Sequence, residues 1–297
     1  MTDAAAISPF ASPVLVTGAH GQLGRHVLEA AAARGVAAIG VDIAELDITD
    51  AAAVDAVLEQ LRPSAIINCA AYTAVDRAEE PSELDLATRV NVEGPRVLAE
   101  AAKAHGVHLV HVSTDYVFPG TSAHGYAEHD ATGPINVYGH TKLDGEHAIR
   151  TVLGETAAIA RTAWLFSRQA PNFVQAIAGL AEGREFIEVV DDQRGNPTWA
   201  GHLAEALVTL AVERIGGTHH TVDQPEATWF ELAQAIVEEL GLDCEVRPTT
   251  SDKFVRPAAR AAVSVLRSTD PETPVMGQWR DGVRASLADR KLAAAQQ

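Results

Sequence analysis

The sequence predicts an α/β fold, built on a doubly wound parallel sheet and completed by a smaller C-terminal domain. Short β-branched apolar runs alternate with Ala-rich helical patterns through the first half of the chain, and short links join them. Such alternation is typical of βαβ units in a parallel sheet. After Trp164 the alternation loosens. We therefore expect one domain over residues 12–168 and a second mainly over residues 169–297, with segments near 186–222 returning to the first.

The composition disfavours several classes of partner. The chain has 297 residues and a formal net charge of −17 at pH 7, which opposes binding to nucleic acid or to an anionic membrane. Its two cysteines, Cys69 and Cys244, belong to no metal-binding motif and are too few for a disulfide framework. The N-terminus lacks a signal-peptide pattern, and no apolar run reaches the roughly 18 residues of a membrane span. We expect a soluble, cytoplasmic protein without a metal site.

A glycine-rich turn links the first predicted strand to the first predicted helix. Residues 13–17 form a short apolar run, and residues 25–34 follow a helical pattern. Between them lie Gly18, Gly21 and Gly24. Glycines at this spacing let a pyrophosphate approach the free N–H groups of a helix N-terminus. The turn is a candidate dinucleotide site, although an ordinary glycine-rich turn has the same composition.

An acidic residue ends the second predicted strand, which covers residues 36–41. Asp42 closes this strand about 20 residues after the glycines. A carboxylate there accepts hydrogen bonds from an adenosine ribose and repels a 2′-phosphate, so it favours NADH over NADPH. Arg25 offsets part of that repulsion if it lies nearby. The alternative for Asp42 is a helix cap or a solvated turn residue.

The third and fourth predicted strands end in small or hydroxyl residues. The strand at residues 65–69 leads into residues 70–73, and the strand at residues 107–112 leads into Thr114. Small residues let a cofactor approach the backbone, and a hydroxyl can hydrogen-bond a substrate carbonyl. Both segments are also ordinary turn compositions.

One helix carries a tyrosine and a lysine four residues apart. It follows a loop at residues 119–135, a length at which loops are often functional. Residues i and i+4 share a face of a helix, so Tyr138 and Lys142 are neighbours. A nearby ammonium lowers the pKa of a phenol and makes it a stronger acid near neutral pH. The pair is a candidate proton donor, although this spacing also occurs by chance.

The candidate residues converge on one edge of the predicted sheet. A fifth strand at residues 157–161 ends near Trp164. Open parallel sheets bind ligands at the carboxyl ends of their strands. That edge would carry the glycine turn, Asp42, Ala71, Tyr72, Thr114, Tyr138 and Trp164. Because these residues are far apart in the sequence, their convergence is the main argument for a site.

The remaining elements are shorter. Helices are expected after an N-cap at Thr49 or Asp50 and over residues 84–105, 173–181, 199–214 and 228–240, and strands over residues 186–190 and 218–222. The segment 252–270 carries Lys253, Arg256, Arg260 and Arg267. In so acidic a chain this segment is a candidate for holding phosphates, with a surface loop as the alternative.

Six stretches form recognisable blocks, at residues 18–24, 70–79, 113–120, 136–146, 161–164 and 192–198. The Ser-Thr-Asp-Tyr-Val-Phe and Tyr-Gly-x-Thr-Lys-Leu-x-Gly-Glu blocks are specific when found together. In this order the blocks resemble the dTDP-4-dehydrorhamnose reductase family of extended short-chain dehydrogenase/reductases. The resemblance implies a Rossmann-like NAD(P)-binding domain followed by a substrate-binding domain for a sugar nucleotide.

The resemblance also implies residue roles. Tyr138 donates a proton to the sugar C4 carbonyl as a hydride arrives from NADPH or NADH, Lys142 binds the nicotinamide ribose and lowers the pKa of Tyr138, and Thr114 supplies the catalytic hydroxyl. The implied dinucleotide contacts are Gly18, Gly21, Gln22, Leu23, Gly24, Asp42, Asp47, Ile48, Ala71, Tyr72, Thr73, Tyr138 and Lys142. The implied contacts to a dTDP-sugar are Thr114, Asp115, Trp164 and Arg260.

The chain departs from the family pattern in two places. The family's Arg-Pro-x-x-Ser motif, whose arginine helps to hold the nucleotide, is matched by residues 260–264 without the proline, and Arg256-Pro257 offers a competing register. Some members link dimers through magnesium and a glutamate where this chain has His26, so we expect no Mg²⁺ contact. A monomer or a homodimer is expected.

The sequence therefore predicts an NAD(P)H-dependent reductase that converts dTDP-4-dehydro-β-L-rhamnose to dTDP-L-rhamnose. Two alternatives stay open. One is a reductase of another dTDP-4-ketosugar. The other is a non-catalytic regulatory subunit that resembles the methionine adenosyltransferase regulatory subunit and keeps the cofactor loop without turnover.

Overall fold

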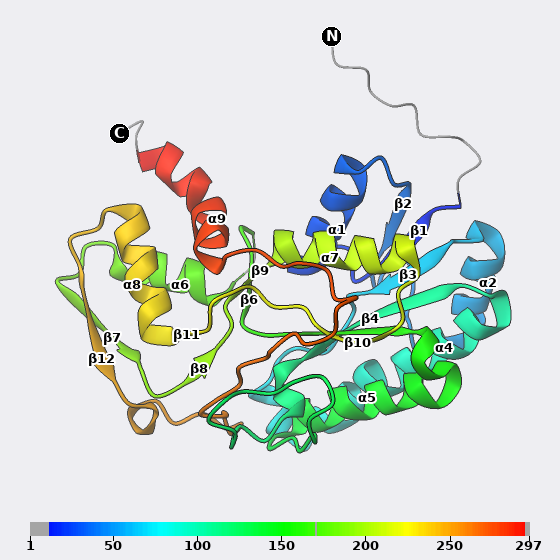
Figure 1. Ribbon diagram of the computed structural model, residues 1–297, viewed down its shortest axis with the longest axis horizontal. Helices are drawn as coiled ribbons and strands as arrows, with labels where there is room; N and C mark the ends of the chain where they lie inside the picture. Colours follow the sequence, from blue (N-terminus) through cyan, green and yellow to red (C-terminus); the bar gives the residue numbers. More distant parts are fainter. Residues whose placement is uncertain (1–11, 170, 295–297) are drawn as a thin grey trace, which may run out of the picture.

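The computed structural model describes residues 12–169 and 171–294. Figure 1 shows a central sheet with helices on both faces and a smaller lobe at one end. The sheet has six strands in the order β10-β5-β4-β3-β1-β2, and every neighbouring pair is parallel. The direction of winding reverses between β1 and β3, where sheets of this kind bind ligands. The predicted α/β class, a Rossmann-like doubly wound sheet, is confirmed.

The elements of the large domain follow the predicted alternation. Its strands are β1 (Val14–Thr17), β2 (Ala38–Val41), β3 (Ala65–Asn68), β4 (His108–Thr114), β5 (Ala158–Thr162) and β10 (Gly217–His220). Helices α1 (Gln22–Ala33) and α7 (Ala200–Glu213) cover one face, and α2 (Ala51–Leu61), α4 (Gly94–His105) and α5 (Val137–Leu153) cover the other. None of the helices in the described ranges is long and apolar enough to cross a membrane.

Both faces of the sheet are buried, which explains the continuous apolar runs of its strands. On β1, Val14 and Val16 pack against α1 and α7. Leu15, between them, points to the opposite face and packs with α2 and α4. This alternation makes β1 the centre of two hydrophobic cores and places the turn that follows it at the edge of the sheet.

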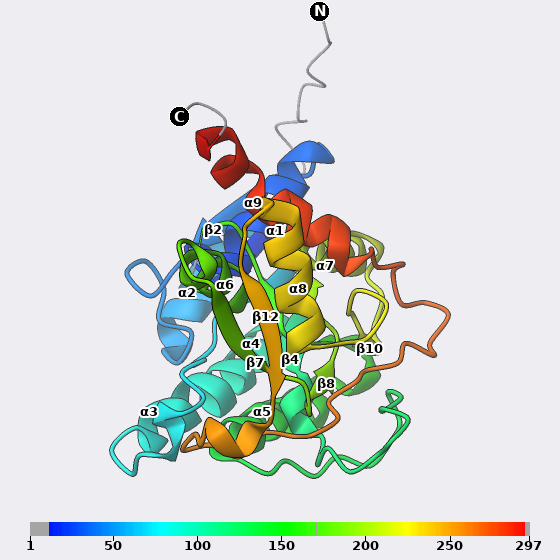
Figure 2. The same cartoon turned by 90° about the vertical axis from the view of Figure 1, so that its left-hand side faces the viewer.

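The smaller lobe has its own core. Strands β7 (Phe186–Val190) and β12 (Glu245–Thr249) form a parallel pair, and helices α6 (Phe173–Ala181), α8 (Trp229–Leu240) and α9 (Trp279–Ala294) pack around it. Figure 2 shows β7, β12 and α8 together on the side of the molecule that faces the viewer. A capping box of Thr228 and Glu231 starts α8, in agreement with the helix start predicted at Thr228.

Two short pairings lie between the lobes. Strand β6 (Leu165–Phe166) pairs with β9 (Thr198–Trp199), and β8 (Arg194–Gly195) pairs with β11 (Ala227–Thr228). The segment 186–222 is divided between the two lobes. Helix α7 packs on the large sheet and β10 extends that sheet, whereas β7 pairs with β12 in the smaller lobe. The predicted edge strand at residues 218–222 is confirmed as β10.

The long helix predicted over residues 84–105 is one unbroken helical run, but it is not α-helical throughout. It consists of α3 (Leu84–Thr88), a π-helical turn at Arg89–Glu93, and α4. The wider turn contains Asn91, whose carbonyl lies so close to Gly145 of α5 that a Cβ there would overlap it. Such π turns often occur at functional sites.

Candidate active site

The glycine turn after β1 has the shape of a phosphate cradle. Gly18 has a φ of +64°, and a Cβ there would lie 2.7 Å from the backbone nitrogen of Ala70 after β3. A Cβ on Gly24 would overlap the carbonyl of Gly18. No side chain in the described part of the chain caps α1, which begins at Gln22. Its first N–H groups are therefore available to an anion, and the turn fits a dinucleotide pyrophosphate.

Asp42 lies against this turn, where the sequence predicts a ribose contact. Its carboxylate accepts hydrogen bonds from the backbone N–H groups of His20 and Ile43, both at 2.8 Å. Asp47 accepts from Thr49, and these hydrogen bonds lower the pKa of Asp47. Ile48 is buried in the core under α2 and α4. The dinucleotide contacts of these residues stay a prediction.

Asn91 ties the loop after β3 to helix α5. Its side chain accepts from the Tyr72 N–H at 2.9 Å and donates to the Tyr72 carbonyl at 3.1 Å. It also donates to the Thr141 hydroxyl at 3.0 Å. Thr141 lies between Tyr138 and Lys142 on α5, so Asn91 fixes the cofactor-side loop against the helix of the candidate proton donor. Sequence reasoning missed this residue, because no local motif marks the π turn that aims it.

The candidate proton donor and the candidate hydroxyl are in contact. Asn136 caps α5 by accepting from the Gly139 N–H at 2.8 Å, which starts the helix one residue before Tyr138. Tyr138 and Thr114 are both buried, and the Thr114 hydroxyl lies near enough to the Tyr138 phenol to lower its pKa. The ring of Tyr116 packs edge-to-face on the Tyr138 ring at 5.4 Å. The predicted approach of β4 and α5 thus brings the two hydroxyls together.

The pKa of Tyr138 shifts opposite to the expected direction. Burial raises it, and the Thr114 hydroxyl offsets only part of that effect. The Nζ of Lys142 donates to the Val112 carbonyl at 2.7 Å. Burial lowers the pKa of Lys142 to about 8. Desolvation, a tertiary property that helical spacing does not reveal, therefore outweighs the effect expected of Lys142.

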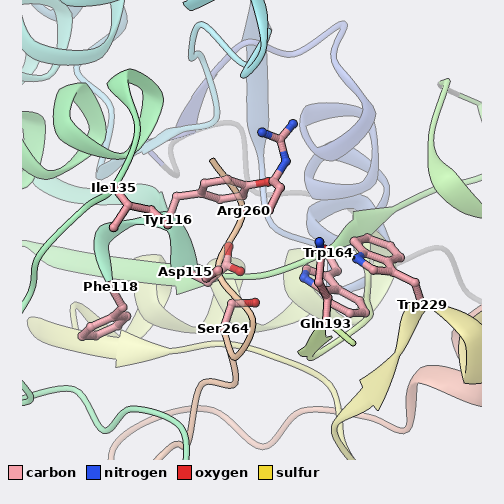
Figure 3. A pocket seen from close by; sticks show the side chains of 10 residues that line it. Asp115, Tyr116, Phe118, Ile135, Trp164, Gln193, Trp229, Arg260 and Ser264 are labelled. Carbon is pink, nitrogen blue, oxygen red and sulfur yellow. Dashed lines mark hydrogen bonds between the residues drawn. The ribbon is translucent and has the colours of Figure 1, made fainter. Parts of the chain in front are cut away.

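A pocket opens next to Thr114 and Tyr138, since Asp115 follows Thr114 in the chain and Tyr116 packs on the Tyr138 ring. Its lining includes Asp115, Tyr116, Trp164, Arg260 and Ser264, and its volume is about 60 Å³. Figure 3 shows Asp115 next to Ser264, and Trp164 next to Trp229, which starts α8 of the smaller lobe. Burial raises the pKa of Asp115 to about 6, and a hydrogen bond with Ser264 offsets part of the shift. Three of the four predicted substrate contacts, Asp115, Trp164 and Arg260, thus line one pocket, and Thr114 is not among its lining residues.

Trp164 adopts a backbone conformation that bulky residues rarely adopt. Its φ is +45°, and the Thr198 N–H donates to its carbonyl at 3.2 Å. Strain of this kind is found mainly at functional sites, where the surrounding structure enforces it. Here the constraint comes from the β6–β9 pairing and from Trp229, which stacks on the indole.

Two arginines of the basic segment pair with one carboxylate. Arg260 Nη2 lies 3.0 Å from Asp76 Oδ1, and Arg256 Nη1 lies 3.5 Å from Asp76 Oδ2. The Arg260 side chain lines the pocket and is 23% exposed, whereas that of Arg256 is 65% exposed. Of the two registers left open by the sequence, Arg260 is the one that reaches the pocket.

Some residues that shape the site escaped the sequence reasoning. Glu146 closes the Tyr138 block and accepts from Ser113 and Arg161 while buried. Asp76 lies in the 70–79 block, and this position is the only sequence feature that could have pointed to its contact with Arg260. Trp229 gave no signal beyond its place at the start of a predicted helix.

No cluster of three potential metal ligands occurs in residues 12–169 and 171–294. His26 is buried, with Nδ1 3.2 Å from Glu29. Burial is the main cause that lowers the pKa of His26. The expectation that this position makes no Mg²⁺ contact stays a prediction.

Known proteins resemble the chain over most of its length. The RmlD substrate binding domain family matches residues 12–292. A dTDP-4-dehydrorhamnose reductase of Streptomyces griseus is 46% identical, covering 88% of this chain and 87% of its own. A probable dTDP-4,6-dihydroxy-2-methyloxan-3-one 4-ketoreductase of Streptomyces antibioticus is 44% identical, covering 93% and 94%.

A solved structure agrees with this similarity. It is the dTDP-4-dehydrorhamnose reductase of Bacillus anthracis str. Ames in complex with NADP. It superposes with a TM-score of 0.88 at 35% identity, covering 94% of this chain and 99% of that one. The resemblance stated from the sequence is confirmed, and the chain belongs to the RmlD substrate binding domain family.

Proposed function

We propose that this chain is an NAD(P)H-dependent reductase that converts dTDP-4-dehydro-β-L-rhamnose to dTDP-L-rhamnose. The buried Tyr138 phenol next to the Thr114 hydroxyl, beside the pocket lined by Asp115, Trp164 and Arg260, carries the proposal. A buried phenol next to a hydroxyl suits the protonation of a carbonyl oxygen. The names of the Streptomyces griseus and Bacillus anthracis relatives support the substrate.

Tyr138 acts as the proton donor in this reaction. NAD(P)H supplies a hydride to C4 of the sugar, and negative charge develops on the carbonyl oxygen. The Tyr138 O–H transfers its proton to that oxygen, while the Thr114 hydroxyl orients the sugar carbonyl. Because burial raises the pKa of Tyr138, the phenol remains protonated near neutral pH until this charge develops.

The dinucleotide lies along the edge of the sheet in this proposal. The glycine turn and the N-terminus of α1 hold its pyrophosphate, and Lys142 holds the nicotinamide ribose. Asp42 faces the adenosine ribose and favours a free 2′-hydroxyl. The Bacillus anthracis relative binds NADP, so we propose that the chain accepts either NADPH or NADH.

Reduction of a related dTDP-4-ketosugar is the second candidate. The name of the Streptomyces antibioticus relative motivates it. A dTDP-4-keto-6-deoxy-D-glucose reductase of Streptomyces niveus, 42% identical over 85% of this chain, supplies the sugar for the test. The two candidates share Tyr138, Thr114 and the cofactor site. They differ in the sugar that fits against Asp115 and Trp164.

Cofactor oxidation at 340 nm tests the proposal. Purified protein should oxidise NADPH or NADH with dTDP-4-dehydro-L-rhamnose faster than with dTDP-4-keto-6-deoxy-D-glucose. Tyr138→Phe should lower kcat by about 10²- to 10⁴-fold and still bind cofactor. Tyr126→Phe is the matched control, because Tyr126 is also buried but its hydroxyl accepts from backbone N–H groups of the 119–135 loop.

The outcomes separate the alternatives. Faster turnover of the second sugar would favour the second candidate. No oxidation of either cofactor with either sugar would overturn the reductase and favour a regulatory subunit. Undiminished kcat in Tyr138→Phe would remove Tyr138 from its proposed role.

A further inference from the structure

A line of buried polar side chains crosses the sheet to Lys142. The strand register pairs Thr17 of β1 with Asn68 of β3, and Asn68 with His111 of β4. Each of these three side chains is at most 1% exposed, and Lys142 is 2% exposed. Thr17 Oγ1 lies 2.6 Å from Asn68 Oδ1, Asn68 Nδ2 lies 2.9 Å from His111 Nδ1, and His111 Nε2 lies 3.3 Å from Lys142 Nζ. The proposed reaction assigns no task to Asn68 or His111.

A backbone group fixes the direction of these hydrogen bonds. The Ala70 N–H donates to Asn68 Oδ1 at 3.1 Å. A backbone N–H is a donor only, so the oxygen of the Asn68 amide must lie on that side and the NH₂ group must face His111. The NH₂ group donates, and His111 therefore accepts through Nδ1.

The tautomer of His111 follows from that orientation. Burial lowers the pKa of His111 well below its usual value, so the ring is neutral near pH 7. A neutral imidazole has one N–H group and one acceptor nitrogen. With Nδ1 accepting from Asn68, the N–H must be on Nε2, which faces Lys142.

Lys142 therefore faces a donor. An ammonium has three donors and no acceptor, whereas a neutral amine has a lone pair. One N–H of Lys142 already serves the Val112 carbonyl. We propose that His111 is a positioning residue for Lys142: held by Asn68 in one tautomer, it directs an N–H group at Nζ and favours the uncharged amine.

Other groups around Nζ also affect the balance between the ammonium and the amine form of Lys142. Glu146, one turn further along α5, favours the ammonium form, and ionised Cys69 at the end of β3 would do the same. Burial raises the pKa of Cys69 to about 12, so its thiol is uncharged near neutral pH. Burial of Nζ is the largest effect and brings the pKa of Lys142 to about 8. The His111 N–H acts in the same direction as burial, because it disfavours the charged form of Lys142.

The pH dependence of NADPH affinity tests the inference, which rests on the proposed contact between Lys142 and the nicotinamide ribose. We expect the affinity of the full wild-type chain to fall as the pH rises through about 8, because the ammonium loses its proton. Lys142→Met should remove this fall and thereby assign it. His111→Gln removes the ring N–H and offers one amide oxygen, which can accept from both the Asn68 NH₂ group and Nζ. This variant should move the fall in affinity to higher pH by about one pH unit.

Two further variants make the test specific. His111→Asn keeps an acceptor for Asn68 but removes the N–H that faces Nζ. It should therefore also move the fall in NADPH affinity to higher pH. His108→Gln is the matched control, because His108 is buried on the same strand at the end remote from Lys142. This control should titrate like the wild type.

The inference is overturned if both His111 variants titrate like the wild type, or if His108→Gln shifts the fall as much as they do. Wild-type protein that binds neither NADPH nor NADH at any pH would overturn the proposed function together with the inference. Normal NADPH affinity with an unmoved pH profile in the His111 variants would overturn the inference alone.

Discussion

The indole rings of Trp164 and Trp229 stack face to face, with their centroids 3.6 Å apart and their planes within 6°. Trp164 follows β5 of the large domain and Trp229 starts α8 of the smaller lobe, so the stack joins the lobes at the pocket (Figure 3). A Cβ on Gly195 would overlap the Trp164 ring. Trp229 and Gly195 together hold Trp164 at its unusual φ of +45°.

Replacing Trp229 should therefore disturb Trp164. An aromatic pair contributes about 0.5–1.5 kcal/mol beyond area burial, so Trp229→Ala should raise the KM for the dTDP-sugar about 3- to 10-fold with a smaller change in kcat. Trp229→Phe keeps an aromatic partner and should keep the wild-type KM. Both variants should lose the exciton couplet that two stacked indoles give in far-ultraviolet circular dichroism. Equal KM values in the two variants would contradict the role given to the stack.

Asp115 should make stability depend on pH. Burial raises its pKa to about 6, above the value of an exposed aspartate. A carboxyl with a raised pKa binds its proton more tightly in the folded chain, so it stabilises the fold when protonated and loses this effect as it ionises. The contribution of Asp115 to the free energy of unfolding should fall by about 3 kcal/mol between about pH 4 and about pH 6.

Urea unfolding of the wild type and Asp115→Asn across this range measures the effect. A difference is needed, because burial lowers the pKa of His220 to about 4, and a histidine with a lowered pKa increases stability as the pH rises. The asparagine variant keeps a similar shape but cannot ionise, so its stability should fall less with pH than that of the wild type. Parallel curves would show that Asp115 does not titrate in this window.

The large sheet and the edge that carries the site follow from local patterns. Apolar runs of strand length, a glycine turn before a helix and hydroxyls after a strand predict where Thr114, Tyr138 and the cradle meet. They suffice because parallel strands bring their carboxyl ends to one edge. The cap of α2 at Asp50 was also foreseeable, since its side chain accepts from the first N–H groups of the helix.

Other features depend on contacts that no local pattern encodes. The π turn at Asn91 arises where α3 and α4 pack against Gly145, more than 50 residues away. Asp76 meets Arg260 across 184 residues. The direction of the pKa shift of Tyr138 depends on its burial by several segments. Residue periodicity describes one element at a time, so these tertiary effects lie outside its reach.

The buried pair of Glu146 and Arg161 should be a large determinant of stability. Arg161 donates to both carboxylate oxygens, at 3.0 and 2.7 Å, and Ser113 donates to Oε1 at 2.5 Å. The two side chains are 3% and 7% exposed. Glu146→Gln leaves a buried charge without its partner, so urea unfolding should show a loss of about 3–5 kcal/mol.

A double variant checks that cause. Glu146→Gln combined with Arg161→Met removes the unpaired charge and should lose less stability than the sum of the two single variants. Glu100→Gln is the matched control, because Glu100 pairs with Arg96 on the surface, and its loss should be at most about 1 kcal/mol. Additive losses in the double variant would contradict the argument.

Arg260 and Arg256 should differ in their effect on substrate binding. Both pair with Asp76, but Arg260 lines the pocket while the Arg256 side chain is 65% exposed. A hydrogen bond to a charged group contributes about 1.5–3 kcal/mol, so Arg260→Ala should raise the KM for the dTDP-sugar about 10- to 100-fold at saturating NADPH. Arg256→Ala serves as the control and should change KM less than about 3-fold. A larger effect at Arg256 would mean that the upstream Arg-Pro register holds the diphosphate.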